Sequence, residues 1–217
     1  MTTDLRGGFA LRGDGQGSAG RSAFFALQLA VASYPGDPLR RDLAECTSRV
    51  MEPLPSDPSE SIARWFGALT ACLPVVDYGI WDFTLVPSVA TTEFRSWVDG
   101  VRQEASLPPD PAETSAFSDR EPVYFVATFA ALSGDVGWAD WVRFYAERVE
   151  RERYFERRTF EALVEALAQT AAGLAHGRTD VLLSTLPRPE MGDPLAERFV
   201  TASALRSDGW SYMRPVF

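Results

Sequence analysis

The feature that most constrains this fold is a change of hydrophobic pattern near residue 76. Before it, apolar residues recur at helical spacing between proline-rich turns. After it, runs rich in aromatic and β-branched residues, which favour strands, are interspersed with further helical patterns. Strands and helices do not alternate regularly, so we expect an α+β fold. The predicted architecture is an N-terminal three-helix segment followed by a small mixed or antiparallel sheet packed with two or more helices.

Three helices are predicted before the change. The first covers 22–34, the second begins at Asp37 and Pro38 and runs to about residue 51, and the third continues through the apolar stripe of 62–72. The short apolar run at 22–33 also has the outline of a signal-peptide core. The segment before it is glycine-rich and carries Asp4 and Asp14, and Gln28 interrupts the run, so a buried helix is favoured instead.

The second part predicts a strand at 78–86, a helix from Thr91 or Thr92, and a helix over 153–176 with a continuous apolar stripe. A strand is favoured at 123–132 over a helix, and a helix is favoured at 138–150 over a hairpin strand. A strand at 179–186, a short helix at 195–205 and a docked aromatic tail complete the expected elements.

The predicted domain organisation is a tail at 1–21 and one α+β domain at 22–217. Six glycines within residues 7–20 favour a flexible tail. The domain is expected to have a helical part, 22–75, and a mixed part, 76–217. At this length most of the apolar surface can be buried without a disulfide or metal.

Charge and composition restrict the function. The net charge of -9 leaves no overall basic surface for phosphates, so we predict no nucleic-acid partner and no anionic membrane partner. All 21 cationic side chains are arginine and the chain contains no lysine and no asparagine, which indicates a GC-rich bacterial genome. Cys46 and Cys72 have neither metal nor redox spacing. They are interpreted as buried, reduced thiols of a cytoplasmic protein without a cofactor or metal.

Candidate catalytic chemistry is sparse. Gly15 to Ser22 has the spacing of a phosphate-binding loop before a helix, but Arg21 occupies the position of the usual lysine. Gly15, Gly20, Arg21 and Ser22 are therefore kept as a possible anion site of a nucleotide binder. Asp82 lies inside an aromatic run and is expected to pair with a buried arginine, with a carboxylate site of a small-molecule binder or an enzyme as the alternative.

The remaining candidate is a charged segment with aromatic neighbours at 138–158. Alternating Glu and Arg at helical spacing are typical of a solvated helix, whereas arginine beside aromatic residues is typical of a protein interface. We predict a non-catalytic protein that acts through protein–protein contacts, as an adaptor, a regulatory module or an acidic inhibitor of a basic target. The predicted partner-binding residues are Trp138, Trp141, Arg143, Arg151, Arg153 and Tyr154.

Overall fold

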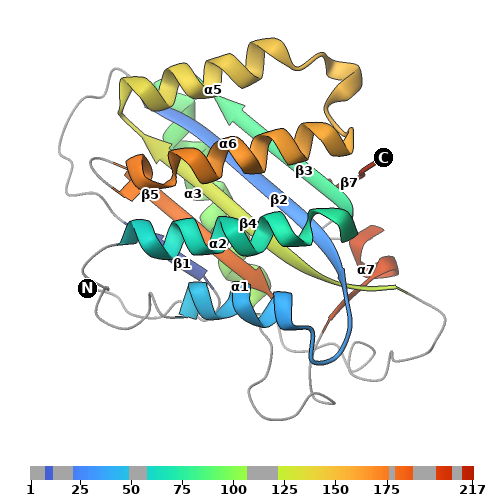
Figure 1. The fold of residues 1–217 in the computed structure, drawn as a ribbon. Helices are drawn as coiled ribbons and strands as arrows, with labels where there is room; N and C mark the ends of the chain where they lie inside the picture. The colour runs from blue at the N-terminus through green and yellow to red at the C-terminus, as the bar shows by residue number, and fades with distance from the viewer. Residues whose placement is uncertain are drawn as a thin grey trace.

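The computed structural model describes residues 8–11, 22–48, 58–106, 122–175, 179–187, 199–206 and 212–217. Its strands form one antiparallel sheet in the order β1-β5-β4-β2-β3-β7, and β6 pairs with the start of β4 (Figure 1). The strands are β1 (Gly8–Leu11), β2 (Ala23–Ser33), β3 (Val76–Thr84), β4 (Val123–Ser133), β5 (Thr179–Leu186), β6 (Val200–Thr201) and β7 (Arg214–Pro215).

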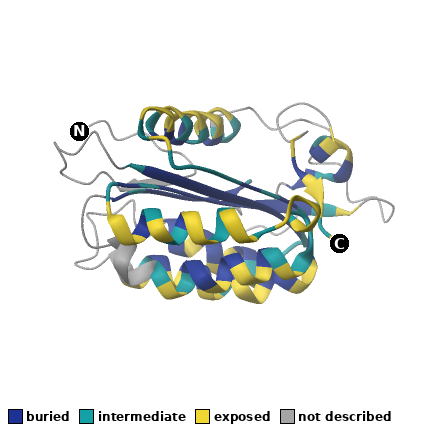
Figure 2. Ribbon diagram, turned by 90° about the horizontal axis from the view of Figure 1, so that it is seen from above, coloured by how far each residue is buried: buried dark blue, intermediate teal, exposed yellow. Residues whose placement is uncertain are grey.

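Helices cover both faces of this sheet. α1, α2, α5 and α6 contribute to the core on one side, called the four-helix face, and α3 and α7 to the core on the other, so the sheet is a buried middle layer (Figures 1 and 2). The helices are α1 (Pro38–Ser48), α2 (Pro58–Cys72), α3 (Pro87–Ser106), α5 (Val136–Arg148), α6 (Arg157–Ala175) and α7 (Ala202–Arg206), with 3-10 turns η2 (Leu73–Val75) and η3 (Arg151–Arg153). Within the described residues, none of these helices combines the length and apolar character needed to cross a bilayer.

The predicted three-helix N-terminal segment is wrong, because the segment assigned to its first helix is strand β2. This strand lies between β3 and β4 at the centre of the sheet. It is buried on both faces from Ala23 to Val31, so its apolar residues do not alternate with polar ones. Its alanines and leucines also have high helix propensity. The overall α+β class is unchanged, but β1 and β2 precede the first helix.

Several other elements are confirmed. Asp37 begins α1 as expected: its carboxylate accepts the N–H of Leu39 at 2.9 Å, and Pro38 is the first helical residue. The preceding turn contains Gly36 at φ +76°, a conformation that glycine adopts without strain. Strand rather than helix forms at Val123–Ser133, and helix rather than strand at Val136–Arg148.

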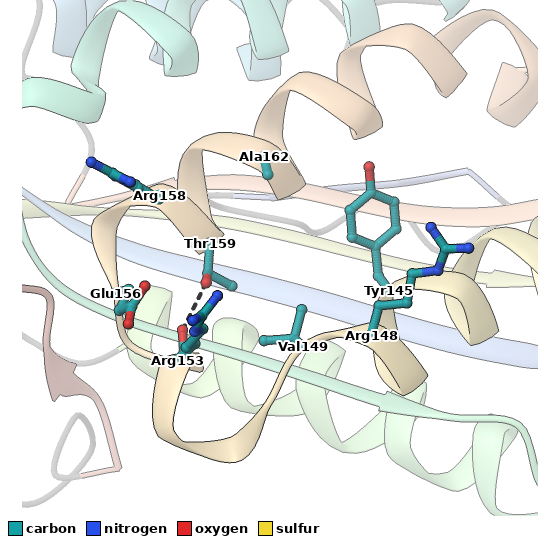
Figure 3. Close-up of a pocket in the computed structure, with 8 residues that line it drawn as sticks. All are labelled: Tyr145, Arg148, Val149, Arg153, Glu156, Arg158, Thr159 and Ala162. Carbon is teal, nitrogen blue, oxygen red and sulfur yellow. Dashed lines mark hydrogen bonds between the residues drawn. The ribbon is translucent and has the colours of Figure 1, made fainter.

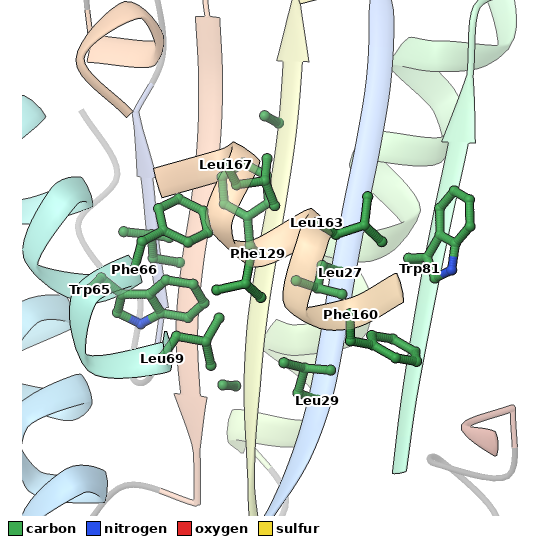
Figure 4. Close-up of a cluster of buried hydrophobic side chains, with 14 of the residues drawn as sticks. Leu27, Leu29, Trp65, Phe66, Leu69, Trp81, Phe129, Phe160, Leu163 and Leu167 are labelled. Atoms are coloured by element: carbon green, nitrogen blue, oxygen red, sulfur yellow. The ribbon is translucent and has the colours of Figure 1, made fainter. Parts of the chain in front are cut away.

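The core between the sheet and the four-helix face is dominated by aromatic and leucine side chains. Figure 4 shows α2 and α6 placing these residues over the central strands. Phe66 of α2 meets Phe129 of β4 with ring centroids 5.1 Å apart. The labelled buried residues from these elements include Trp65, Leu69, Leu27, Leu29, Phe160, Leu163 and Leu167. Fully burying such a side chain contributes about 1.5–3 kcal/mol, so these contacts fix how α2 and α6 sit on the sheet.

The α3 face has a smaller apolar core that contains a buried polar group. Gln28 of β2 is buried among apolar neighbours, and its Nε2 donates to the Thr128 hydroxyl at 2.8 Å. Its Oε1 accepts from the Tyr212 hydroxyl at 2.7 Å. These bonds satisfy the amide that interrupts the apolar run of β2, so the interruption does not exclude a central strand.

Arg40 departs from the helical pattern of α1. The sequence places it on the polar face, but its side chain is 0% exposed. Its Nη2 donates to the Pro187 carbonyl at 2.7 Å, and its guanidinium lies 4.3 Å from the centre of the Phe199 ring. Both partners are more than a hundred residues away in the chain, so helical periodicity could not identify this position as buried.

The C-terminal segment docks onto the sheet edge, as its aromatic composition predicts. Met213 is buried, and the N–H of Val216 donates to the Asp77 carbonyl at 2.8 Å. Phe217 then pairs with the segment before α6, donating to Phe155 and accepting from the N–H of Arg157. The tail therefore connects the edge of β3 to the start of α6.

Gly79 of β3 provides a test of the packing between α6 and the sheet. A Cβ added there would lie 2.7 Å from Cε1 of the buried Phe160 ring and 3.1 Å from Cδ2 of Leu29. We expect Gly79→Ala to lower the free energy of unfolding by about 1–3 kcal/mol, since a packed ring must shift. The matched control is Gly100→Ala at an exposed position of α3, where nothing lies within 4 Å of the added Cβ. It should stabilise the protein by about 0.5–1 kcal/mol in urea denaturation. Equal effects of the two substitutions would contradict the close contact.

Arg157 provides a test of the junction between α2, β3 and α6. Its guanidinium donates to the carbonyls of Leu73, at 2.6 Å, and Val76, at 3.0 Å. We expect Arg157→Ala to destabilise the protein by about 2 kcal/mol, because two charge-assisted hydrogen bonds are lost. Arg158→Ala, the exposed neighbour, should change the free energy of unfolding by less than about 0.5 kcal/mol. Urea denaturation measures both, and a stable Arg157→Ala protein would refute the proposed junction.

Candidate functional site

A surface cleft of about 470 Å³ lies between the end of α5 and the start of α6 (Figure 3). It carries three arginines and one carboxylate, and its floor includes an alanine and a valine side chain. The lining residues are Tyr145, Arg148, Val149, Arg153, Glu156, Arg158, Thr159 and Ala162. The cleft therefore has excess positive charge in a chain of net charge -9.

The segment between α5 and α6 is held in place by two aromatic residues and a hydroxyl. The Trp81 indole N–H donates to the Tyr154 carbonyl at 3.0 Å, and the two ring centroids are 4.6 Å apart. The Thr159 hydroxyl donates to the Arg153 carbonyl at 2.7 Å and ties η3 to the first turn of α6. These contacts position one end of the cleft on β3.

The three cleft arginines have weak partners or none among the described residues. Arg148 lies over the Phe144 ring at 4.0 Å, a cation–π contact. Arg153 pairs with Glu150 at 3.3 Å, but both side chains are largely exposed, so water screens the pair. Arg158 is exposed and forms no ion pair within the part of the chain that the structure describes. Their guanidiniums can therefore bind an added anionic group.

Tyr145 contributes a hydroxyl beside Arg148. Burial, and then the nearby Glu165 carboxylate, raise the pKa of this phenol above its ordinary value of 10.0. A phenol is protonated at neutral pH even at its ordinary pKa, so the hydroxyl can donate a hydrogen bond to a ligand in the cleft.

The structure separates the predicted partner-binding residues into different environments. Trp138 is only 5% exposed, and its indole N–H donates to the Ala23 carbonyl at 3.0 Å, so it packs against β2 and presents little surface to a partner. Trp141 is half-buried and stacks on Trp138 with centroids 5.0 Å apart. Tyr154 is also half-buried, against Trp81. These rings anchor α5 and its following segment to the sheet.

The predicted arginines lie at different places on the same face of the molecule. Arg153 lines the cleft, and Arg151 is exposed on the neighbouring η3 turn. Arg143 pairs with Asp140 at 3.2 Å. It precedes Arg148 by five residues, which turns it by about 140° around the helix and away from the cleft.

Sequence reasoning missed Tyr145, Arg148, Arg158 and Thr159 as members of one cleft. Arg148 follows Phe144 at i+4, which is the available local signal for their stacking. No local signal indicates that Arg148 and Arg158 share a cleft, because the turn between α5 and α6 decides this.

The phosphate-loop interpretation loses its structural basis. Gly15, Gly20 and Arg21 lie outside the described residues. Ser22 is described, but it is followed by strand β2 and not by the helix that such a loop requires. His176 also lies outside the described residues.

Asp82 does not pair with a buried arginine. Its Oδ1 accepts the N–H of Phe83 at 2.8 Å, and no cation pairs with it within the described residues. β7 pairs with β3 only at Tyr78 and Gly79, so Asp82 lies beyond the paired part of this edge. Its carboxylate therefore satisfies a backbone donor of an edge strand, which is a structural role.

The described residues contain neither a cluster of metal-binding side chains nor a cysteine in a setting that favours the thiolate. Among the described residues, no three His, Cys, Asp or Glu side chains cluster in a way that could hold a metal ion. Cys46 and Cys72 are both free and buried. Burial and the nearby carboxylates of Asp37 and Asp42 raise the pKa of Cys72 to about 12, which keeps this thiol protonated.

Comparison of the chain with protein-family models, curated proteins and solved structures finds no match. Functional inference therefore starts from the chemistry of the cleft.

Asp82 yields a prediction about stability and pH. Burial raises its folded-state pKa above the ordinary value of 3.8, so the folded protein binds this proton more tightly than the unfolded chain does. This tighter proton binding adds to the stability of the wild-type protein at low pH. The added stability is lost as the pH rises from the ordinary pKa through the raised one. Asp82→Asn removes the loss, so its stability relative to wild type should increase as the pH rises above the ordinary aspartate pKa of 3.8 in urea denaturation. A difference that stays constant or decreases as the pH rises would contradict the raised pKa.

Proposed function

We propose that this protein is non-catalytic and acts by binding another protein, as an adaptor or a regulatory module. The proposed contact surface is the α5–α6 face, defined as the cleft together with Phe144 and Arg151. The single observation that carries the proposal is the exposed Phe144 ring with Arg148 stacked on it at the mouth of a cleft.

The composition of this face supports the proposal. Phe144 is 46% exposed, which is high for a phenylalanine on a helix anchored by buried tryptophans. Aromatic residues and arginine are enriched at protein interfaces and dominate their binding energy. The Arg148 side chain covers one side of the Phe144 ring, and this contact orders its guanidinium before binding. The side chain therefore loses less conformational entropy when a partner binds.

The rigidity of the surroundings also supports the proposal. Trp138, Trp141 and Tyr145 form a continuous series of ring contacts from the core to the cleft, with centroid distances of 5.0 Å and 4.9 Å. A surface that is already ordered loses little conformational freedom on binding. The α5–α6 face is thus suited to recognition by a preformed site.

A bacterial cytoplasm is the proposed compartment. The two cysteines are buried and form no disulfide, which is typical of a reducing environment. The arginine-only cation content is typical of a GC-rich genome.

Charge reversal on the α5–α6 face tests the proposal. Proteins captured from source-organism lysate by the wild-type chain would be identified, purified and titrated calorimetrically. Arg148→Glu with Arg158→Glu should weaken binding of the true partner by at least about tenfold. Both substitutions remove a guanidinium contact and place a negative charge where the partner meets a positive one.

The control is Arg64→Glu with Arg95→Glu, two exposed arginines on α2 and α3 that lie outside the face. This pair changes the net charge equally and should alter the affinity by less than about twofold. Unchanged melting temperatures would show that all variants are folded. Full-affinity binding by the cleft variant would refute the proposed surface.

A further inference from the structure

The distribution of charge along the cleft indicates the chemistry of its occupant, and this inference rests on the proposed function. The lining of the cleft contains three guanidiniums and one carboxylate, that of Glu156. None of the three is neutralised by a buried ion pair. Arg148 and Arg158 form no ion pair among the described residues and Arg153 has only an exposed one, so the lining has an excess of positive charge that favours an anionic ligand.

The spacing of the arginines favours an extended ligand. Figure 3 shows Arg148 and Arg158 at opposite ends of the cleft, with Arg153 beside Thr159 between them. A single phosphate is best held by several donors that converge on one point. Guanidiniums arranged along a groove instead match carboxylates spaced along a polypeptide.

The floor of the cleft indicates that the ligand also carries apolar side chains. Val149 and Ala162 lie between the charged ends (Figure 3). The Tyr145 hydroxyl adds a neutral hydrogen-bond donor to the lining. A volume of about 470 Å³ accommodates a few side chains.

We infer that the α5–α6 cleft binds an extended acidic segment of the partner protein. Carboxylates of that segment pair with Arg148, Arg153 and Arg158, and an apolar side chain packs over Val149 and Ala162. Arginine suits this role because its planar guanidinium can bind a carboxylate with two parallel hydrogen bonds.

Synthetic peptides test this inference without the natural partner. A fluorescein-labelled peptide of about ten residues that alternates Glu with Leu and Ala would be titrated with the full chain by fluorescence polarisation. Its control would carry Gln in place of every Glu. We expect the acidic peptide to bind at least about tenfold more tightly than the Gln peptide, and to weaken between about 50 mM and about 300 mM NaCl. Equal binding of the two peptides would overturn the inference.

Two further arms locate the binding site and identify its ligand class. Arg148→Glu with Arg158→Glu should reduce binding of the acidic peptide at least about tenfold, whereas Arg64→Glu with Arg95→Glu should change it by less than about twofold. Equal losses in the two variants would overturn the inference, because attraction to the peptide would then be non-specific. Inorganic phosphate that displaces the peptide at micromolar concentration would also overturn it in favour of a compact anion.

The peptide and partner experiments separate the two proposals. If cleft charge reversal abolishes binding of the purified partner but the acidic peptide does not bind, the contact surface is supported and the acidic ligand is refuted. If cleft charge reversal changes neither partner nor peptide binding, both are refuted.

Discussion

The structure depends on burial of the central strand β2 on both of its faces. Residues Ala23–Ser33 pair with β4 on one side and with β3 on the other, and they contribute alternately to the four-helix core and to the α3 core. An extended segment that is covered in this way fixes two layers at once, because its side chains point in opposite directions. The cores cannot rearrange independently, and the helices are positioned by the strand they share.

The position of the α5–α6 cleft is a consequence of this arrangement. α5 is fixed to β2, since Trp138 donates to the Ala23 carbonyl and Phe25 packs edge-on against Trp141 with centroids 5.2 Å apart. α6 is fixed separately, by Phe160 against the bare backbone of Gly79. The short segment that joins these helices bends over Trp81 at the sheet edge. The helices are thereby held apart at the surface, and the arginines at their ends line the space between them.

Electrostatics gives this cleft its distinct character. Most charged side chains of the chain are acidic, yet the cleft combines three arginines with a single glutamate. Exposed ion pairs contribute little to stability, so these arginines are available for recognition at little cost to the fold. Arg157 shows the other use of the same side chain, because its guanidinium binds two main-chain carbonyls and joins β3 to α6. Adjacent arginines in sequence thus have separate roles, one in the fold and one in the proposed site.

The sequence by itself determined the elements that have a specific cap, an apolar stripe at helical spacing, or a composition that favours strands. These include α1 with its Asp37 cap, the apolar stripe of α2, and strands β4 and β5. Only the tertiary structure decided that 23–33 is a strand, because burial on both faces removes the alternation that identifies strands in sequence. It also decided the burial of Arg40 and the gathering of Arg148, Arg153 and Arg158, whose environments come from distant segments and from a turn between helices. Local periodicity reports which side of an element is covered, whereas a cleft depends on how separate elements pack against a common sheet.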